Sequence, residues 1–452
     1  MSTLKSLVKK PSTQAMFVLL LWAISVEYQA YTGLFNGPLT LVLKEKGFLS
    51  WAITGFLYAG LIAGAGVEKL LERFLPPAAI AMVAISLLTG SIWGYFLLLA
   101  WGETSPIPFI LCRIAEGIAA TTFYDSIFFL FKQHYGKQKK TAEAISRRNA
   151  ATATSLGLAS ITSYYLVDTL SHEKWLLYSG CIVVSSIALL CIILFTLSRS
   201  SNIAYPEKEK AQTNTDTNNN NKGNNNNTTG VVAPISHWAI LFLMLGVIAP
   251  TATVHTLLTI HLPGDVGESY PDPPVVMVWS SSMFLLGSVA GSLSAKQFAT
   301  NWQRYQLFAG CLPIVGGLAL LAIGGHNIRV LLLSQVMLGW GIYVVSTLVE
   351  ITLQRLSLNL SKQEGMKSLA IDFMRFLSVF VFGVIADKTE RLYLWLAASP
   401  LPFIGACVLP KWSKFILRHL PQEEAPQQVT LTNRVKFALL GLGLWFCLLW
   451  PR

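Results

Sequence analysis

Three ionisable residues stand inside a run of aromatic, aliphatic and small residues, LCRIAEGIAATTFYDSIFF, at positions 111–129. Arg113 and Glu116 are one helical turn apart, a spacing that allows an ion pair on one helix. Asp125 follows Arg113 by roughly 18 Å along a helix. The first cation that follows Asp125 in the sequence is Lys132, so we expect the partner of Asp125 on another helix. Charges in such surroundings can bind a solute, carry a proton or join one helix to its neighbours, and the sequence leaves these alternatives open.

A second pair of opposite charges, Asp372 and Arg375, lies in the apolar run SLAIDFMRFLSVF. The pair can neutralise itself, or it can open and exchange one partner for a charged solute. Gln335 stands at the position that corresponds to Arg113 in the second half of the sequence, which makes Arg375 the main deep cation there. We therefore expect Arg375 to contact an anion or a carboxylate.

Two further titratable residues lie in apolar runs. Glu27 stands in WAISVEYQAYTG, and a carboxyl group in apolar surroundings can serve as a proton carrier. His255 stands in APTATVHTLLTI, and histidine changes its charge near neutral pH. Both residues also have a structural interpretation, as hydrogen-bonded groups inside a helix bundle, and for a lone histidine this is the commoner role.

The runs that carry these residues have the composition of membrane-spanning helices. Of the 452 residues, 53% are hydrophobic and only 13% are charged, and the mean hydropathy is +0.52. Soluble domains carry roughly a quarter charged residues. A run of about twenty apolar residues can cross a hydrocarbon layer about 30 Å thick. The sequence therefore predicts an all-α polytopic membrane protein.

Twelve spans are predicted, in two sets of six. They are residues 14–35, 49–67, 77–100, 107–131, 149–167 and 175–197, followed by residues 237–261, 274–295, 305–325, 328–352, 367–386 and 392–409. We expect an N-terminal six-helix bundle over residues 1–197 and a C-terminal six-helix bundle over residues 236–410. Residues 198–235 include TNTDTNNNNKGNNNNTTG, a polar tract that cannot bury a core and that predicts a disordered linker.

The last segment, residues 411–452, is a basic tail. Its apolar stretch at residues 435–450, VKFALLGLGLWFCLLW, is short for a span. This length favours an interfacial or re-entrant helix over a thirteenth crossing. At the other end of the chain, the first apolar run has no small-residue cleavage site, so we expect a retained first span and not a signal peptide.

The net charge of +11 is unevenly distributed. Six basic residues crowd the connector after the fourth span: Lys132, Lys137, Lys139, Lys140, Arg147 and Arg148. The connector at residues 102–105 has only Glu103. The positive-inside rule then places the linker and both ends of the twelve-helix bundle in the cytoplasm, and it explains the basic balance without nucleic acid. All six cysteines lie in apolar runs, and we expect neither a disulfide nor a metal or cofactor site.

The two sets of spans show an internal repeat. Gly287 follows Gly60 by 227 residues (287 − 60), and each begins a Gly-x-x-x-Gly pattern. Gly339 follows Gly117 by 222 residues (339 − 117). Small residues at this spacing are common wherever membrane helices pack closely. The near-constant offset and the central linker together favour two copies of a six-helix unit, which is a frequent plan in transporters.

This layout resembles the major facilitator superfamily, whose second and third spans are joined by Gly-x-x-x-Asp-Arg with further glycine and basic residues. The residues that match, in a degenerate form, are Gly64, Glu68, Lys69 and Arg73 in the first copy, Gly291 and Lys296 in the second copy, and Arg113 and Gly117 in the Arg-x-x-x-Gly pattern of the fourth span. The resemblance implies solute binding between two rocking bundles, a cytoplasmic gate at the matching loop residues, and first-span residues such as Glu27 facing the central cavity.

A finer resemblance is to the folate and thiamine carriers within this superfamily. It is carried by GIAATTFYDSIFFLF, LSKQEGMKSLAIDF, VIADKTERL and Arg147. Phe123 and Gly33 stand where glutamates would be expected. The resemblance implies a vitamin of the folate or thiamine type as the solute.

The leading hypothesis is a secondary active transporter that moves a small polar organic solute by alternating access, with coupling to protons through Glu27, Glu116 and Asp125. The chain has no Gly-x-x-x-x-Gly-Lys-Ser/Thr phosphate loop and no paired-histidine or Gly-x-Ser-x-Gly motif, which argues against an ATPase or another enzyme. We expect a monomer in the cell or plasma membrane. Two alternatives stay open: an exporter of drugs or metabolites, and a membrane scaffold that moves no solute.

Overall fold

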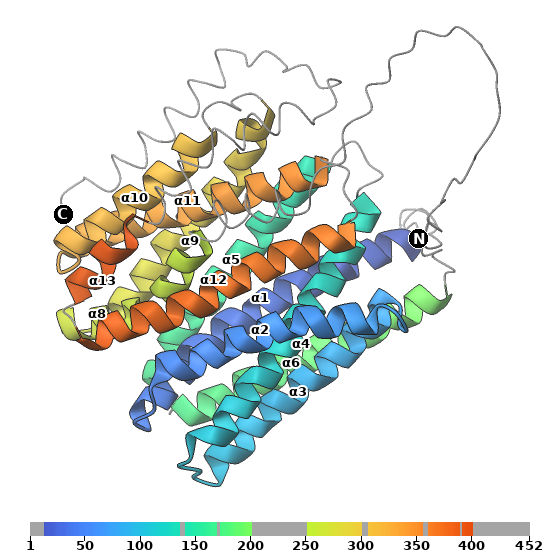
Figure 1. Cartoon of the computed structure of the whole chain (residues 1–452), viewed down its shortest axis with the longest axis horizontal. Coiled ribbons are helices and arrows are strands. Elements are labelled where there is room, and N and C mark those ends of the chain that lie inside the picture. The colour runs from blue at the N-terminus through green and yellow to red at the C-terminus, as the bar shows by residue number, and fades with distance from the viewer. Residues whose placement is uncertain are drawn as a thin grey trace, which may run out of the picture.

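The computed structural model describes residues 13–135, 141–169, 172–200, 251–300, 306–355, 360–388 and 391–400 (Figure 1). Within these ranges the chain is helical and contains no strand. The predicted Asn-rich linker from residue 201 onward and the apolar tail segment at residues 435–450 lie outside the described residues.

Six long helices form the N-terminal half. They are α1 (Thr13–Glu45), α2 (Ser50–Leu71), α3 (Pro77–Ala100), α4 (Pro106–Tyr135), α5 (Thr141–Thr169) and α6 (His172–Ser200). The described part of the C-terminal half contains a helical segment, Thr251–Ile260, and the helices α8 (Leu262–Ser269), α9 (Pro273–Thr300), α10 (Gln306–Gly324), α11 (Ile328–Arg355), α12 (Leu360–Lys388) and α13 (Arg391–Ala398).

Eight helices in the described ranges are long and apolar enough to cross a membrane. The all-α membrane fold predicted from the sequence is therefore confirmed, and the twelve-span count fits the order of the helices. Helix α5 begins at Thr141, eight residues before the predicted fifth span. Its first turns are polar, but Ser146, Arg148 and Asn149 are buried by neighbouring helices, so these residues need not face lipid.

Each half is held together by contacts among its own helices (Figure 1). In the N-terminal half, α4 packs against α2 and α3, and α1 packs against α5 and α6. In the C-terminal half, α11 packs against α9 and α10. In the described part of the chain the halves meet mainly through α5 with α9 and α2 with α12, and also through α5 with α11 and α4 with α12. These helices form the boundary at which residues from both halves meet.

Close helix crossings in the N-terminal half depend on glycine. A Cβ atom on Gly60 of α2 would collide with the carbonyl group of Ile114 on α4. A Cβ atom on Gly117 of α4 would collide with the carbonyl group of Leu57 on α2. Only a residue without a side chain allows the two backbones to approach this closely.

The C-terminal half repeats this crossing with α9 and α11. Gly287 meets the carbonyl group of Val336, and Gly339 meets that of Phe284. The glycines that match along the sequence thus make the same kind of contact in each half, between α2 and α4 in the first and between α9 and α11 in the second. This agreement supports the internal repeat read from the sequence.

The two ends of the helix bundle differ in charge. We call the end that carries the exposed residues Lys69, Arg73 and Arg147 the basic end, and the opposite end the distal end. The sequence analysis placed Arg148 in the connector after the fourth span, and this prediction is wrong. Arg148 lies within α5 and is only 1% exposed.

Candidate functional site between the two halves

Arg113 and Glu116 belong to a hydrogen-bonded network inside the N-terminal half. Arg113 Nη1 donates to Glu116 Oε2 at 2.8 Å and to Asn36 Oδ1 at 3.2 Å. The hydroxyl of Tyr31 donates to Glu116 Oε1 at 2.8 Å, and that of Tyr95 donates to Oε2 at 3.2 Å. The network joins α1, α3 and α4, and it satisfies both oxygens of the carboxylate.

This geometry favours the structural alternative for the first ion pair. A buried ion pair is stable when further hydrogen bonds complete it, as two tyrosines do here. Glu116 is 2% exposed and Arg113 is fully buried. Neither side chain contacts the C-terminal half through a described hydrogen bond.

The second pair, Asp372 and Arg375, lies at the boundary between the halves. Arg375 Nη1 is 3.7 Å from Asp372 Oδ1, a loose contact, and the side chains are 30% and 8% exposed respectively. The guanidinium carbon of Arg375 lies 6.0 Å from the ring centre of Tyr58 on α2. Arg375 therefore faces an aromatic ring of the other half, at the range of a cation–π contact.

Aromatic rings of the N-terminal half also lie at the boundary between the halves. The ring of Tyr28 lies 5.3 Å from that of Phe123 and 5.9 Å from that of Tyr124. Tyr28 interacts electrostatically with Asp372, across the boundary between the halves. Tyr124 likewise interacts with Tyr343 of α11.

The C-terminal half contributes a third group of rings. His255 packs 5.9 Å from Phe284, and Phe284 packs 6.3 Å from Tyr343. Both His255 and Tyr343 interact electrostatically with Arg375. His255 thus joins the boundary cluster and does not stand alone in the helix packing.

We call this cluster the central site. It consists of Tyr28, Tyr58, Tyr124, His255, Tyr343, Asp372 and Arg375, which come from five helices and the segment Thr251–Ile260. Tyrosine rings offer flat surfaces and hydroxyl groups, and a partly exposed arginine offers charged donors to a carboxylate. The arrangement suits a flat organic molecule with an acidic group.

Glu27 and Asp125 occupy different places. The hydroxyl of Ser186 on α6 donates to both carboxylate oxygens of Glu27, at 3.1 and 3.0 Å, so Glu27 points towards α6 and not towards α12. Asp125 is buried, at 2% exposure, and it interacts electrostatically with Tyr28. Asp125 therefore lies next to the central site, whereas Glu27 contacts a helix of its own half.

The halves are tied together at the basic end by polar contacts that the sequence analysis missed. Asn149 Nδ2 donates to Glu350 Oε2 at 2.7 Å and to Thr347 Oγ1 at 3.2 Å. Ser146 Oγ donates to the carbonyl oxygen of Ser292 at 2.5 Å. We call these five residues the basic-end contact. Glu350 is buried at 5% exposure.

The predicted gate residues differ in their surroundings. Gly64 closely approaches the carbonyl group of Ile118, and Gly291 closely approaches that of Trp340, so both serve helix packing within one half. The charged members differ in burial: Glu68 is buried, Lys69 and Arg73 are exposed, and the side chain of Lys296 lies outside the described residues.

At the distal end, α2 and α12 hold the halves together. Trp51 Nε1 donates to Asp387 Oδ2 at 2.9 Å, and the ring of Trp51 packs edge-on against Phe380 at 5.9 Å. Gly55 and Gly383 allow these rings to lie close to the backbone of the facing helix. The halves are thus in contact at both ends of the boundary.

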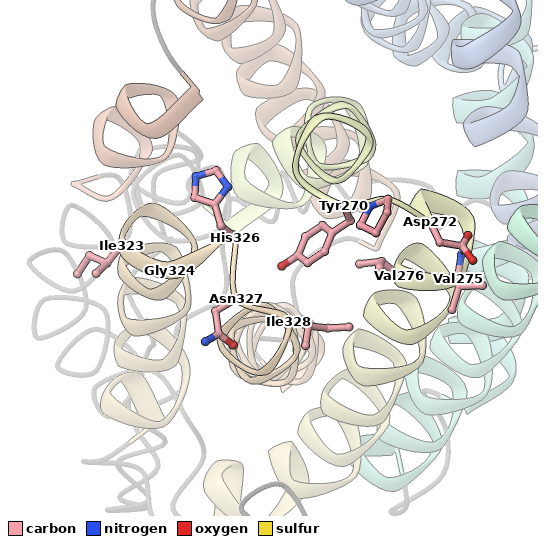
Figure 2. A pocket seen from close by; sticks show the side chains of 10 residues that line it. Tyr270, Asp272, Val275, Val276, Ile323, Gly324, His326, Asn327 and Ile328 are labelled. Carbon is pink, nitrogen blue, oxygen red and sulfur yellow. The ribbon is translucent and has the colours of Figure 1, made fainter. Parts of the chain in front are cut away.

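A separate hollow of about 670 Å³ lies at the distal end of the C-terminal half (Figure 2). It is lined by residues around Tyr270 and His326, in the turns before α9 and before α11. Tyr270 donates a hydrogen bond to the carbonyl oxygen of Gly325 at 2.7 Å, and His326 Nδ1 lies 3.1 Å from Ser269 Oγ. These two interactions join the end of α8 and the segment between α8 and α9 to the turn before α11. The residues that line the hollow include none of the charged residues singled out from the sequence.

Comparison with known families agrees with this architecture. The sequence matches the family model described as Major Facilitator Superfamily over residues 13–383. The chain belongs to the major facilitator superfamily. Its members are membrane transporters, and the chain is an integral membrane protein and a secondary transporter of some solute. No curated protein matches the sequence. In this major facilitator chain, the described residues contain no group of three or more His, Cys, Asp or Glu side chains that could hold a metal ion.

Proposed function

We propose that the central site binds a small organic solute with a flat ring and an acidic group, and that the protein moves this solute by alternating access. The observation that carries the proposal is the state of Arg375. Its side chain is 30% exposed, its guanidinium is only loosely held by Asp372 at 3.7 Å, and it faces Tyr58 of the opposite half. A carboxylate can replace Asp372 as its partner with little change in net charge.

The surrounding side chains support a flat solute. Tyr28, Tyr124 and Tyr343 approach the boundary from both halves, and aromatic faces stack on planar rings. A site formed by both halves is also the site that a rocking motion exposes first to one side of a membrane and then to the other. Vitamins of the folate type combine a flat ring with carboxylates, in line with the resemblance noted above. Thiamine carries a positive charge and would depend on Asp372.

A thermal-shift series on the purified protein tests the solute class. The ligands are the ring carboxylates nicotinate, 4-aminobenzoate and folate, with nicotinamide and thiamine as neutral and cationic counterparts. We expect at least one carboxylate to raise the melting temperature more than nicotinamide does. A shift with thiamine alone would assign the site to cations and would reject the acidic solute.

We also propose proton coupling and an orientation. Asp125 and Asp372 are buried carboxyl groups at or beside the central site, which is where a proton can affect solute binding. Uptake of nicotinate into proteoliposomes should rise with an imposed pH gradient, and equal uptake without the gradient would remove the coupling.

The basic end should face the cytoplasm, since Lys69, Arg73 and Arg147 are exposed there. Labelling of single cysteines at these positions in intact cells tests the orientation.

A further inference from the structure

Arg148 is a buried cation that the central site does not include. It is 1% exposed and lies on α5 between the aromatic side chains of α4. Its guanidinium carbon is 4.0 Å from the ring centre of Phe128, 5.3 Å from that of Phe131 and 5.4 Å from that of Tyr124. Among the residues that the structure describes, Nε and Nη1 of Arg148 have no hydrogen-bond partner.

Such an arrangement stabilises a positive charge only in part. Cation–π contacts attract a guanidinium, but they leave its N–H donors unsatisfied. Arg113, the comparable cation of α4, also has two donors without a hydrogen-bond partner among the described residues, but a carboxylate lies 2.8 Å from its Nη1. The described neighbours of the Arg148 guanidinium are the aromatic rings of α4. A buried arginine with free donors is therefore suited to receive an anion.

The position of Arg148 links the central site to the basic end. Tyr124 is shared, because its ring lies 5.9 Å from Tyr28 of the central site and 5.4 Å from the guanidinium carbon of Arg148. The next residue on α5, Asn149, donates to Glu350 and so closes the basic-end contact. An opening of that contact would separate α5 from α11 at the residue next to Arg148.

We infer that Arg148 is a second anion-binding residue of the transport path, which holds the acidic group of the solute while the basic end is open. The inference rests on the proposed function, because it takes the acidic solute from there. Arg375 then binds the acidic group in the central site, and Arg148 binds it at the next step towards the basic end.

The test is exchange of labelled nicotinate across proteoliposomes that contain unlabelled nicotinate. Arg148→Met keeps a long apolar side chain but removes the charge, and Arg148→Lys keeps the charge. Arg147→Gln is the matched control, since Arg147 is the exposed neighbour on the same helical turn. We expect Arg148→Met to slow exchange at least tenfold, Arg148→Lys to slow it less, and Arg147→Gln to stay within twofold of the wild type. The nicotinate-induced thermal shift of Arg148→Met should persist, because the central site is intact.

Two results would overturn the inference while leaving the proposed function in place. One is wild-type exchange by Arg148→Met. The other is an equal loss in Arg148→Met and Arg148→Lys together with a lower melting temperature, which would indicate a packing role. If the wild-type protein neither binds nor exchanges nicotinate, the proposed solute class fails and the inference falls with it.

Discussion

Arg113 and Glu116 face each other across one turn of α4, with Nη1 and Oε2 2.8 Å apart and side-chain exposures of 0% and 3%. Tyr31 and Tyr95 complete the carboxylate from α1 and α3. The pair is thus the point at which three helices of the N-terminal half are joined. The two ion pairs thus differ. Arg113 and Glu116 join helices of the N-terminal half, whereas Arg375 on α12 faces the other half.

Removing one member of the Arg113–Glu116 pair should destabilise the protein strongly. Glu116→Ala leaves the guanidinium buried without its counter-ion, which costs about 3–5 kcal/mol in buried pairs. The double variant Arg113→Met, Glu116→Ala should lose less than the sum of the two single variants, since no charge is left unpaired. Thermal unfolding of the four detergent-solubilised proteins measures this coupling. Simple additivity would show that the two charges do not stabilise each other.

The glycine crossings predict a contrast within one helix. Gly60→Ala in α2 places a methyl group against the carbonyl group of Ile114, so the melting temperature should fall by several degrees. Gly66→Ala lies in the same helix with no atom within 4 Å of the added methyl group. It should be neutral or stabilising by up to about 1 kcal/mol, because alanine favours helix over glycine. Equal melting temperatures for the two variants would contradict the packing role of Gly60.

Binding of an acidic solute should depend on Arg375 and not on Asp372. Arg375→Gln removes a charge-assisted hydrogen bond worth about 1.5–3 kcal/mol, so the affinity for nicotinate should fall roughly 10- to 100-fold. Asp372→Asn removes the competing carboxylate and should keep or raise the affinity. Titration by thermal shift or calorimetry measures both. Weaker binding of nicotinate by Asp372→Asn than by Arg375→Gln would contradict the assignment of Arg375 as the partner of the acidic group.

The basic-end contact should control how often that end opens. Glu350→Ala removes the acceptor of Asn149 Nδ2 at 2.7 Å, and a lost bond of this kind is worth about 1.5–3 kcal/mol. The reporter is a single cysteine at Ser292, which is fully buried, in a variant without the native cysteines. Its reaction with maleimide should become roughly tenfold faster or more in Glu350→Ala. An unchanged rate would show that Asn149 and Glu350 do not hold this end closed.

Periodic and compositional features made much of the fold predictable from the sequence. Apolar runs gave the helices, and the matched spacing of Gly60 with Gly287 and of Gly117 with Gly339 pointed to crossings that recur in both halves. The boundary position of Arg375 could also be anticipated, because a lone deep cation in the second half needs a polar surrounding.

Other features depend on contacts that no local pattern reveals. Arg148 was assigned to a loop because basic residues precede it, but α5 begins earlier and turns the side chain onto the aromatic face of α4. Asn149 and Glu350 are far apart in the chain, and only the docking of the two halves brings them together. The direction of Glu27 depends on the rotation of α1, and polar and aromatic residues on several faces of that helix leave the rotation open.

Alternating access between two halves is the central claim, and a reversible cross-link at the basic end tests it most directly. Ser146 Oγ lies 2.5 Å from the carbonyl oxygen of Ser292, so the two positions are neighbours across the boundary. Cysteines at both positions, in a variant without the native cysteines, are therefore the pair to cross-link. We predict that the oxidised Ser146→Cys, Ser292→Cys protein exchanges no labelled nicotinate in proteoliposomes and that reduction restores exchange. If the fully cross-linked protein exchanged nicotinate as fast as the protein does after chemical reduction, alternating access would be contradicted.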